Sequence, residues 1–176
     1  EILPRMAERL GHSPRLRVAG LHDPTQLAAL SGPNLEMVGS VDDLTPFYDD
    51  ARVFLAPTRF AAGLPHKVQE AAAFGVPVVC TSLLARQLDW RDNVEVLVAD
   101  SPDDFAARCA VLYRDAVLWT RLREAALARV AEECSPAVFR AALGGALEEA
   151  RVCARFRPHR SGQECHAASA AATGEG

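Results

Sequence analysis

The sequence predicts an α/β fold, a doubly wound parallel sheet with helices on both faces and with extra C-terminal helices. Short apolar runs alternate along the chain with longer amphipathic segments, and this order is typical of parallel strands joined by crossover helices. The short runs, such as RVFLA and PVVCT, are apolar almost throughout, as in strands that are buried on both faces. The expected domain is therefore Rossmann-like.

The expected strands are short apolar runs that turn-forming residues separate. They cover Leu16–Ala19, Leu35–Val38, Arg52–Ala56, Pro77–Thr81 and Val94–Val98. The expected helices follow from cap residues and from helical periodicity. They cover Glu1–Leu10, Pro24 to about Leu30, Asp42 or Asp43 to about Asp50, Leu64–Phe74, Pro102 to about Tyr113, Ala116–Cys134 and Pro136 to about Val152. Gly75 is expected to end the fourth of these helices in the left-handed conformation.

Residues 1–154 are expected to form one domain, a size that the 176-residue chain allows. The first residues have the pattern of a helix already under way, and the chain begins without Met, so we expect it to be a fragment of a longer protein. Residues 155–176 lack apolar periodicity and are rich in Arg, His, Ser, Ala and Gly. That composition predicts a disordered tail.

Composition argues against several classes of protein. The formal charge of -4 provides no basic surface for nucleic acid. No apolar run approaches the roughly 18 residues that span a bilayer, and the N-terminus lacks a signal-peptide pattern. The five cysteines are widely spaced without a CxxC pair, which argues against a disulfide framework or a zinc site. We expect a reducing, cytoplasmic location, with Cys80 as a buried strand residue.

The segment Pro57–Val79 carries the clearest functional signal. Gly63 precedes a helix whose first N–H groups can face an anion, and Lys67 adds a positive charge. Glu70 lies further along the same helix, where a carboxylate can accept hydrogen bonds from sugar hydroxyls. A phosphate at the helix tip and a diol further along describe a sugar nucleotide. An ordinary exposed pair of Lys67 and Glu70 explains the same spacing equally well.

Three runs together resemble one family. They are VGSVDDLTPFYDDARVFLAPTR, KVQEAAAFGVPVV and VEVLVADSPDDFAARCAVLYRD. In these runs the chain resembles the nucleotide-binding half of group 1 (family 4) glycosyltransferases, and the likeness covers roughly residues 1–151. The resemblance implies one half of a GT-B fold. It also implies a retaining, hexosyltransferase-like transfer of a sugar from a nucleotide diphosphate sugar, as in polysaccharide or glycan biosynthesis.

The resemblance also implies roles for individual residues. Glu70 matches the second glutamate of the family's E-x7-E motif, which holds the donor ribose. Gly63 and Leu64 match the loop whose amides face the donor phosphates and sugar. Ser40 and Val41 match the turn beside the nucleobase. The remaining matches are Leu44, which lines the nucleotide pocket, and Thr81 and Ser82, which end a strand near the site.

Two departures from the family pattern stand out. Ala62 occupies the place of the first motif glutamate, so the usual carboxylate toward the donor sugar is absent. Arg59 and Gly63 match an R-x-x-x-G variant of this loop, in which Arg59 contacts phosphate or sugar. A solvated charge on the loop is the plainer interpretation of Arg59. The chain also starts after the domain's expected first strand, so the basic pair that follows that strand lies outside the sequence.

The implied partners are a nucleotide diphosphate sugar and a glycan, lipid or protein acceptor that an N-terminal domain would hold. The isolated chain is expected to be inactive without that domain, and the full-length protein to be cytoplasmic or peripheral at a membrane. No cofactor or metal is expected. Two alternatives remain, a noncatalytic module with a degenerate site and a GT-B epimerase acting on UDP-linked amino sugars.

Several other residues allow both a functional and a structural interpretation. His66 either donates to phosphate or is simply exposed, and Trp90 is interpreted as a lid or domain contact. Trp119 is expected to pack against neighbouring helices. The acidic group Asp42, Asp43, Asp49 and Asp50 is better explained by capping than by Mg²⁺, and Cys165 with His159 and His166 lacks a fourth zinc ligand.

Overall fold

The structure is a computed structural model, and it describes residues 1–20 and 32–155, with side chains as far as residue 151. The chain divides into two compact units, Glu1–Ser135 and Pro136–Gly176. The helix expected from Pro24 to Leu30 lies outside the described residues, as does the expected tail beyond Arg155. The expectation of one domain over residues 1–154 stays a prediction.

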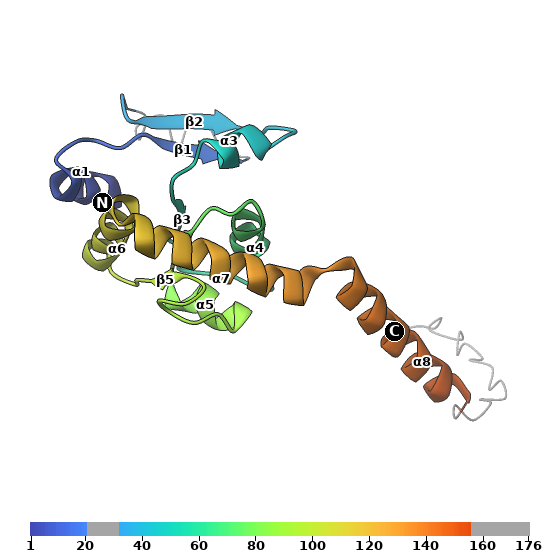
Figure 1. Ribbon diagram of the computed structural model, residues 1–176. Coiled ribbons are helices and arrows are strands. Elements are labelled where there is room, and N and C mark those ends of the chain that lie inside the picture. Colours follow the sequence, from blue (N-terminus) through green and yellow to red (C-terminus); the bar gives the residue numbers. More distant parts are fainter. Residues whose placement is uncertain (21–31, 156–176) are drawn as a thin grey trace, which may run out of the picture. The chain divides into compact units, whose positions relative to one another are not determined.

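The first unit contains two parallel sheets (Figure 1). Strands β1 (Leu16–Ala19) and β2 (Leu35–Gly39) form one, and β3 (Phe54–Ala56), β4 (Val78–Cys80) and β5 (Leu97–Val98) form the other in that order. The alternation of strands and helices confirms the α/β class. The hydrogen-bonding differs from the expectation in one respect, because β1 and β3 do not pair and the strands make two sheets.

The helices of this unit follow the expected order, with one addition. They are α1 (Ile2–Leu10), α3 (Thr45–Asp49), α4 (His66–Ala73), α5 (Ser82–Leu88), α6 (Pro102–Arg114) and α7 (Ala116–Cys134). Helix α5 is the addition. It begins directly after β4, and its C-cap Asp89 adopts the left-handed conformation at φ 55°. Helix α5 therefore has neither a loop before it nor a glycine after it, the two signals that usually mark helix ends in a sequence.

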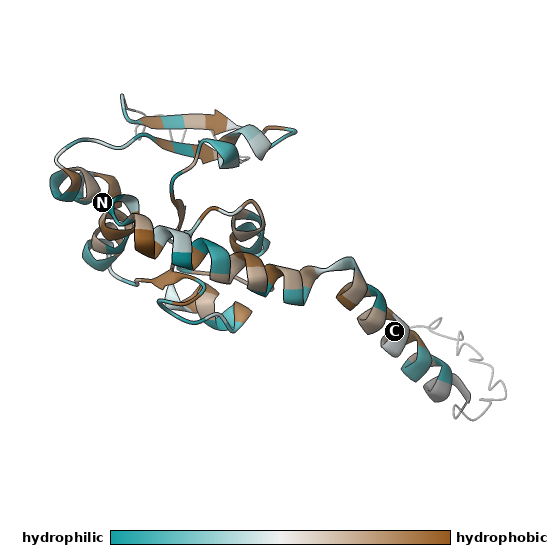
Figure 2. Ribbon diagram, viewed as in Figure 1, coloured by the Kyte–Doolittle hydropathy of each residue, from teal (hydrophilic) through white to brown (hydrophobic). Residues whose placement is uncertain are grey.

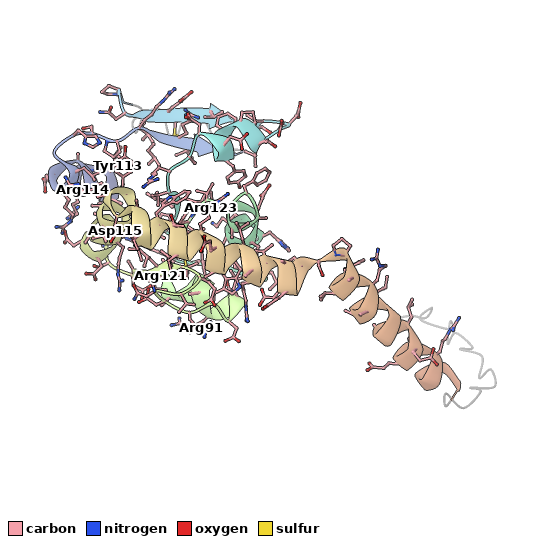
Figure 3. All side chains as sticks on the ribbon, in the orientation of Figure 1. Arg91, Tyr113, Arg114, Asp115, Arg121 and Arg123 are labelled. Carbon is pink, nitrogen blue, oxygen red and sulfur yellow. The ribbon has the colours of Figure 1, made fainter. Side chains whose placement is uncertain are left out.

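Capping side chains set the bounds of the long helices. Ser101 accepts a hydrogen bond from the Asp104 N–H at 3.1 Å and so caps α6, as its Ser-Pro start predicts. Asp115 separates α6 from α7 (Figure 3), and its carboxylate accepts from the N–H groups of Val117 and Leu118. The turn between these two helices is therefore fixed by one side chain.

The core lies on both faces of the β3–β4–β5 sheet. In β4, Val78 and Cys80 pack in a cluster with residues of α3, α4, α5 and α7, whereas Val79 packs in a second cluster with residues of α1 and α6. This is the period-two alternation of a strand, with both faces buried as the apolar run predicts. Figure 2 shows the same hydrophobic character along β3, which supplies Leu55 to the second cluster.

Two buried residues of the core, Cys80 and Trp90, test expectations from the sequence. Cys80 is fully buried, as expected, and burial raises the pKa of its thiol to about 12, with the nearby Asp92 and Asp100 adding to the effect. Trp90 is only 4% exposed, and its Nε1 donates to Glu133 Oε2 at 3.1 Å. The interpretation of Trp90 as a lid or domain contact is therefore wrong, because the indole packs in the core against α7.

The second unit contains α8 (Pro136–Arg155), which begins at the expected proline and extends three residues beyond its expected end. Phe139, Leu143 and Leu147 recur at four-residue spacing and are exposed. No helix in the described part of the chain combines the length and apolar character that a bilayer span requires.

Candidate functional site

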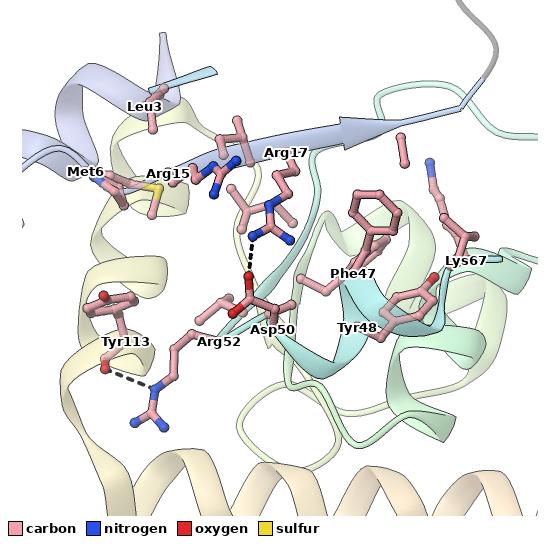
Figure 4. Close-up of a pocket in the computed structure, with 18 of the residues that line it drawn as sticks. Leu3, Met6, Arg15, Arg17, Phe47, Tyr48, Asp50, Arg52, Lys67 and Tyr113 are labelled. Carbon is pink, nitrogen blue, oxygen red and sulfur yellow. Dashed lines mark hydrogen bonds and ion pairs between the residues drawn. The ribbon is translucent and has the colours of Figure 1, made fainter. Parts of the chain in front are cut away.

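A cavity of about 530 Å³ lies in the first unit, between the edge of β1 and the edge of β3. Residues of α1, β1, α3, β3, α4 and α6 line it (Figure 4). One end lies among Leu3, Met6 and Tyr113, and the other lies beside Tyr48 and Lys67. Strand β1 points toward the Lys67 end, so that end is at the carboxyl edge of the sheets, where open α/β folds bind ligands.

Three of the residues predicted to bind a donor line this cavity, namely Leu44, Lys67 and Glu70. Leu44 is the N-cap of α3, and the other two lie on α4. Helix α4 begins at His66, two residues later than expected, because Pro65 is its N-cap with ψ 68°. Glu70 therefore lies about 6 Å along the axis from the first helical residue at 1.5 Å per residue.

The other predicted residues lie in exposed or half-buried loops outside the cavity lining; they are Ser40, Val41, Arg59, Gly63 and Leu64. Gly63 adopts φ 82°, a left-handed conformation that suits glycine, and it directly precedes Leu64, which is 61% exposed. Ala62 and His66 are also exposed. The loop before α4 thus presents backbone and a few side chains to solvent.

Two hydrogen bonds tie this loop to its neighbours. Lys67 Nζ donates to Thr58 Oγ1 at 2.6 Å, and Thr81 Oγ1 donates to the Thr58 carbonyl at 2.8 Å. Thr81 is only 7% exposed, so its hydroxyl anchors the loop to the end of β4. Among the described residues no ion pair joins Lys67 to Glu70, so the exposed pair that their spacing allows is not formed.

Tyr48 is a site residue that sequence reasoning missed. It is buried on α3, and its ring stacks on Phe74 with centroids 4.7 Å apart. Burial is the main cause that raises the pKa of Tyr48 to about 12, and the charge of Glu70 and a hydrogen bond with that carboxyl contribute to the same increase. The four-residue spacing of Leu44 and Tyr48 in the expected helix was the available signal, since it places both on one face.

The remaining charges around the cavity are mostly paired. Arg17 forms an ion pair with Asp50 across the gap between β1 and α3, and Arg52 stacks over Trp119 at 4.8 Å from the ring centroid. Asp43, one residue before the N-cap Leu44, accepts a hydrogen bond from the Thr45 N–H at 2.9 Å and so satisfies the first N–H group of α3, although Asp43 is not itself the N-cap. Trp119 packs as expected and also donates through Nε1 to the Arg52 carbonyl at 2.7 Å.

Comparison with solved structures supports the fold. The chain is similar to sucrose-phosphate synthase from Thermosynechococcus elongatus, with a TM-score of 0.72 and 18% sequence identity. The match covers 86% of this chain and 42% of that protein, so the chain spans less than half the length of this relative. At this identity the likeness establishes a Rossmann-like half of a GT-B architecture. No curated protein matches the sequence significantly.

Comparison with protein families gives the assignment. Residues 1–115 match the family described as Glycosyl transferases group 1. The match covers more than half of the chain, and it includes β1–β5, α4 and the cavity. The protein therefore belongs to the group 1 glycosyl transferases.

Proposed function

We propose that this chain is the donor-binding domain of a retaining glycosyltransferase that takes a nucleotide diphosphate sugar. The observation that carries the proposal is the convergence of Leu44, Lys67 and Glu70 on one cavity at the carboxyl edge of the sheets. Membership of the group 1 family supports it. The family gives the class of reaction, and the placement of these side chains gives a site of suitable chemistry.

The proposed binding mode divides the donor between two parts of α4. The Glu70 carboxylate accepts hydrogen bonds from the ribose hydroxyls. The diphosphate lies toward the loop before α4, where the backbone at Gly63 and Leu64 is exposed and the positive end of the helix dipole favours an anion. Val41 and Ser40, after β2, lie on the nucleobase side in this mode.

Charge development explains why cations and N–H groups suit this site. The leaving nucleotide diphosphate gains negative charge in the transition state, and donors that are already in place stabilise it without reorganisation. Lys67 supplies one positive charge beside the loop, and Arg59 supplies a second from the loop itself. The proposal needs no protonated carboxylic acid, and it includes no metal or cofactor.

The acceptor and the rest of the cleft belong to a second domain in this proposal. A glycan, lipid or protein acceptor would bind there, and the 176-residue chain alone would bind donor without transferring its sugar efficiently. Ala62 favours one alternative, a noncatalytic module, because it leaves an exposed loop position without the carboxylate that the family pattern has there.

Nucleotide binding separates these two possibilities. Thermal unfolding of the chain is measured with UDP, GDP and ADP, and one of them is expected to raise Tm. A ligand at ten times its Kd stabilises the folded chain by about 1.4 kcal/mol, which corresponds to a Tm increase of about 3–6 °C for a domain of this size. No Tm change with any of the three supports the noncatalytic module.

Matched variants locate the binding. Glu70→Gln is expected to abolish the nucleotide-dependent rise, because a neutral amide replaces the carboxylate that accepts from the ribose. Glu124→Gln is the control, since Glu124 is an exposed glutamate on α7 away from the cavity lining. A Tm increase that both variants retain would contradict the assigned role of Glu70. Efficient sugar transfer by the isolated chain would contradict the need for a second domain.

A further inference from the structure

Glu70 is an exposed carboxylate of the cavity lining, and few neighbours orient it. It lies on α4. Within the described ranges, 1–20 and 32–155, no ion pair includes Glu70. Lys67, one turn earlier, donates instead to Thr58 Oγ1 at 2.6 Å. Because a glutamate side chain is flexible, it needs some other partner to present its oxygens in one direction.

The ring of Tyr48 is fixed beside this carboxylate by two aromatic contacts. Tyr48 is 7% exposed and belongs to a core cluster that includes residues of α4. Its ring stacks on Phe74 with centroids 4.7 Å apart, and it lies tilted against Phe54 of β3 at 6.1 Å. Phe74 follows Glu70 by four residues, so both side chains lie on one face of α4. The stack therefore places the phenol next to the carboxylate.

A phenol is also a suitable chemical partner for this carboxylate. Burial above all, and then the charge of Glu70 and a hydrogen bond with its carboxyl, raise the pKa of Tyr48 to about 12. The hydroxyl therefore stays protonated in neutral solution and can donate. An ionised carboxylate has about four acceptor positions, and one hydroxyl occupies only one of them. Glu70 thus keeps its negative charge and its other acceptor positions, whereas an ion pair with lysine would offset that charge.

We propose that Tyr48 is a positioning residue for Glu70, whose carboxylate it holds by donating to one oxygen so that the other acceptor positions face the two ribose hydroxyls of the nucleotide. The inference rests on the proposed function, because it concerns how the same site recognises its ligand. Tyr48 acts through Glu70 and does not touch the nucleotide. A carboxylate held in advance avoids the cost of immobilising a flexible side chain on binding, a factor of about 2 to 12 in affinity.

Nucleotides with and without ribose hydroxyls test the proposal. Dissociation constants are measured by calorimetry for UDP, GDP and ADP and for their 2′,3′-dideoxy counterparts. Tyr48→Phe keeps the stacked ring and removes only the hydroxyl, so the Kd of the ribonucleotide that binds is expected to rise about threefold to tenfold. The Kd of its dideoxy counterpart should stay almost unchanged, because that ligand has no ribose hydroxyls to donate to Glu70.

Tyr113→Phe is the matched control, because it removes the hydroxyl of the chain's other tyrosine, at the opposite end of the cavity (Figure 4). It should change neither Kd. Equal weakening of both ligands in Tyr48→Phe would overturn the proposal, since it would show a general loosening of the site. An unchanged ribonucleotide Kd would also overturn it, and the proposed function would stand if Glu70→Gln still abolished binding. If no nucleotide bound the unmodified chain, the proposed function and this inference would fall together.

A measurement without nucleotide decides the case if Tyr48→Phe fails to fold. The Tyr113→Phe chain, isotope-labelled at the tyrosine ring carbon that bears the hydroxyl, gives an NMR signal from Tyr48 alone. In equal parts of light and heavy water, slow exchange of the hydroxyl proton splits this signal. We expect a split signal, and a single averaged one after Glu70→Ala removes the acceptor. A single signal before that substitution, or a split that remains after it, would overturn the proposal.

Discussion

The rings of Tyr48 and Phe74 stack with centroids 4.7 Å apart and an interplanar angle of 16°. Tyr48 lies on α3 and Phe74 is the C-cap of α4, so the stack holds α3 against the helix that carries Glu70. Offset stacks of this kind contribute about 0.5–1.5 kcal/mol beyond burial. The contact therefore fixes the wall of the cavity opposite β1.

Tyr48 should titrate at unusually high pH. Its pKa is raised to about 12 by burial and by Glu70, against about 10 for tyrosine in the unfolded chain. The folded chain thus holds the phenolic proton more tightly, so this contribution to stability is complete below about pH 10 and is lost as the pH rises toward about 12. Absorbance of tyrosinate in a Tyr113→Phe background reports on Tyr48 alone, since the chain has two tyrosines.

The control for this titration is Glu70→Gln. Removing the carboxylate charge should lower the pKa of Tyr48 while burial keeps it above the ordinary value. A midpoint near 10 in the unmodified chain would show that the phenol is hydrated, and it would remove the physical link between α3 and Glu70. An unaltered midpoint in Glu70→Gln would leave burial as the only cause.

Gly75→Ala should destabilise the first unit more than Gly11→Ala does. Both glycines end helices in the left-handed conformation, at φ 73° and 75°, which costs an L-residue about 1–2 kcal/mol. A Cβ at Gly75 would also lie 2.7 Å from Arg123 Nε, whereas a Cβ at Gly11 meets nothing within 4 Å. Arg123 Nε donates to the Gly75 carbonyl at 3.1 Å, so displacing Arg123 in the Gly75→Ala variant would also weaken that hydrogen bond.

Urea unfolding of the two glycine variants gives the comparison. The shared backbone cost cancels between them, and the difference measures the displacement of Arg123. We expect Gly75→Ala to lose about 1 kcal/mol more, the usual worth of one hydrogen bond. In an Arg123→Ala background the two substitutions should cost about the same, and a difference that persisted there would exclude Arg123 as the cause.

The cysteines should differ sharply in reactivity. Burial raises the pKa of Cys109 and Cys80 to about 12 each, and the thiolate is the reactive form. Cys134 is exposed. Iodoacetamide at pH 8, followed by peptide mapping, should therefore label Cys134 long before Cys80 or Cys109. All three should react together in urea, and rapid labelling of Cys80 in buffer would mean that β4 opens readily.

Helix α7 and strand β1 have the bounds that the sequence predicts because local signals fix them. An Asp115 cap starts α7, and an apolar run makes β1. The fifth strand is shorter than expected, because Asn93 is left-handed at φ 59° and its N–H donates to the Val96 carbonyl. Val94 and Val96 in that turn are β-branched residues that favour a strand, so their side chains alone do not show where the turn ends.

The site was predictable in part for the same reason. Lys67 and Glu70 share one helix, and spacing along a helix places both on a common wall. Tyr48 and Asp50 reach the cavity only because α3 packs against α4 and faces β1, contacts between segments far apart in sequence. The expectation for Trp90 is wrong because its neighbours in the sequence suggest a turn, whereas its hydrogen-bond partner Glu133 lies on α7.

Thr81→Val should loosen the loop that precedes α4. The buried Thr81 hydroxyl donates to the Thr58 carbonyl, and removing a donor from a buried pair leaves the acceptor unsatisfied at a cost of about 1–3 kcal/mol. Valine keeps the shape of threonine, so packing in the core changes little. Urea unfolding measures the loss, and hydrogen exchange across residues 58–64 should become faster.

Thr120→Val, at an exposed position on α7, is the matched control and should change the free energy of unfolding by less than about 0.5 kcal/mol. If the loop takes part in donor binding, Thr81→Val should also weaken the nucleotide-dependent rise in Tm, whereas Thr120→Val should retain it. Unchanged stability and exchange in Thr81→Val would mean that the Thr58 carbonyl is hydrated and that the loop is held by other contacts.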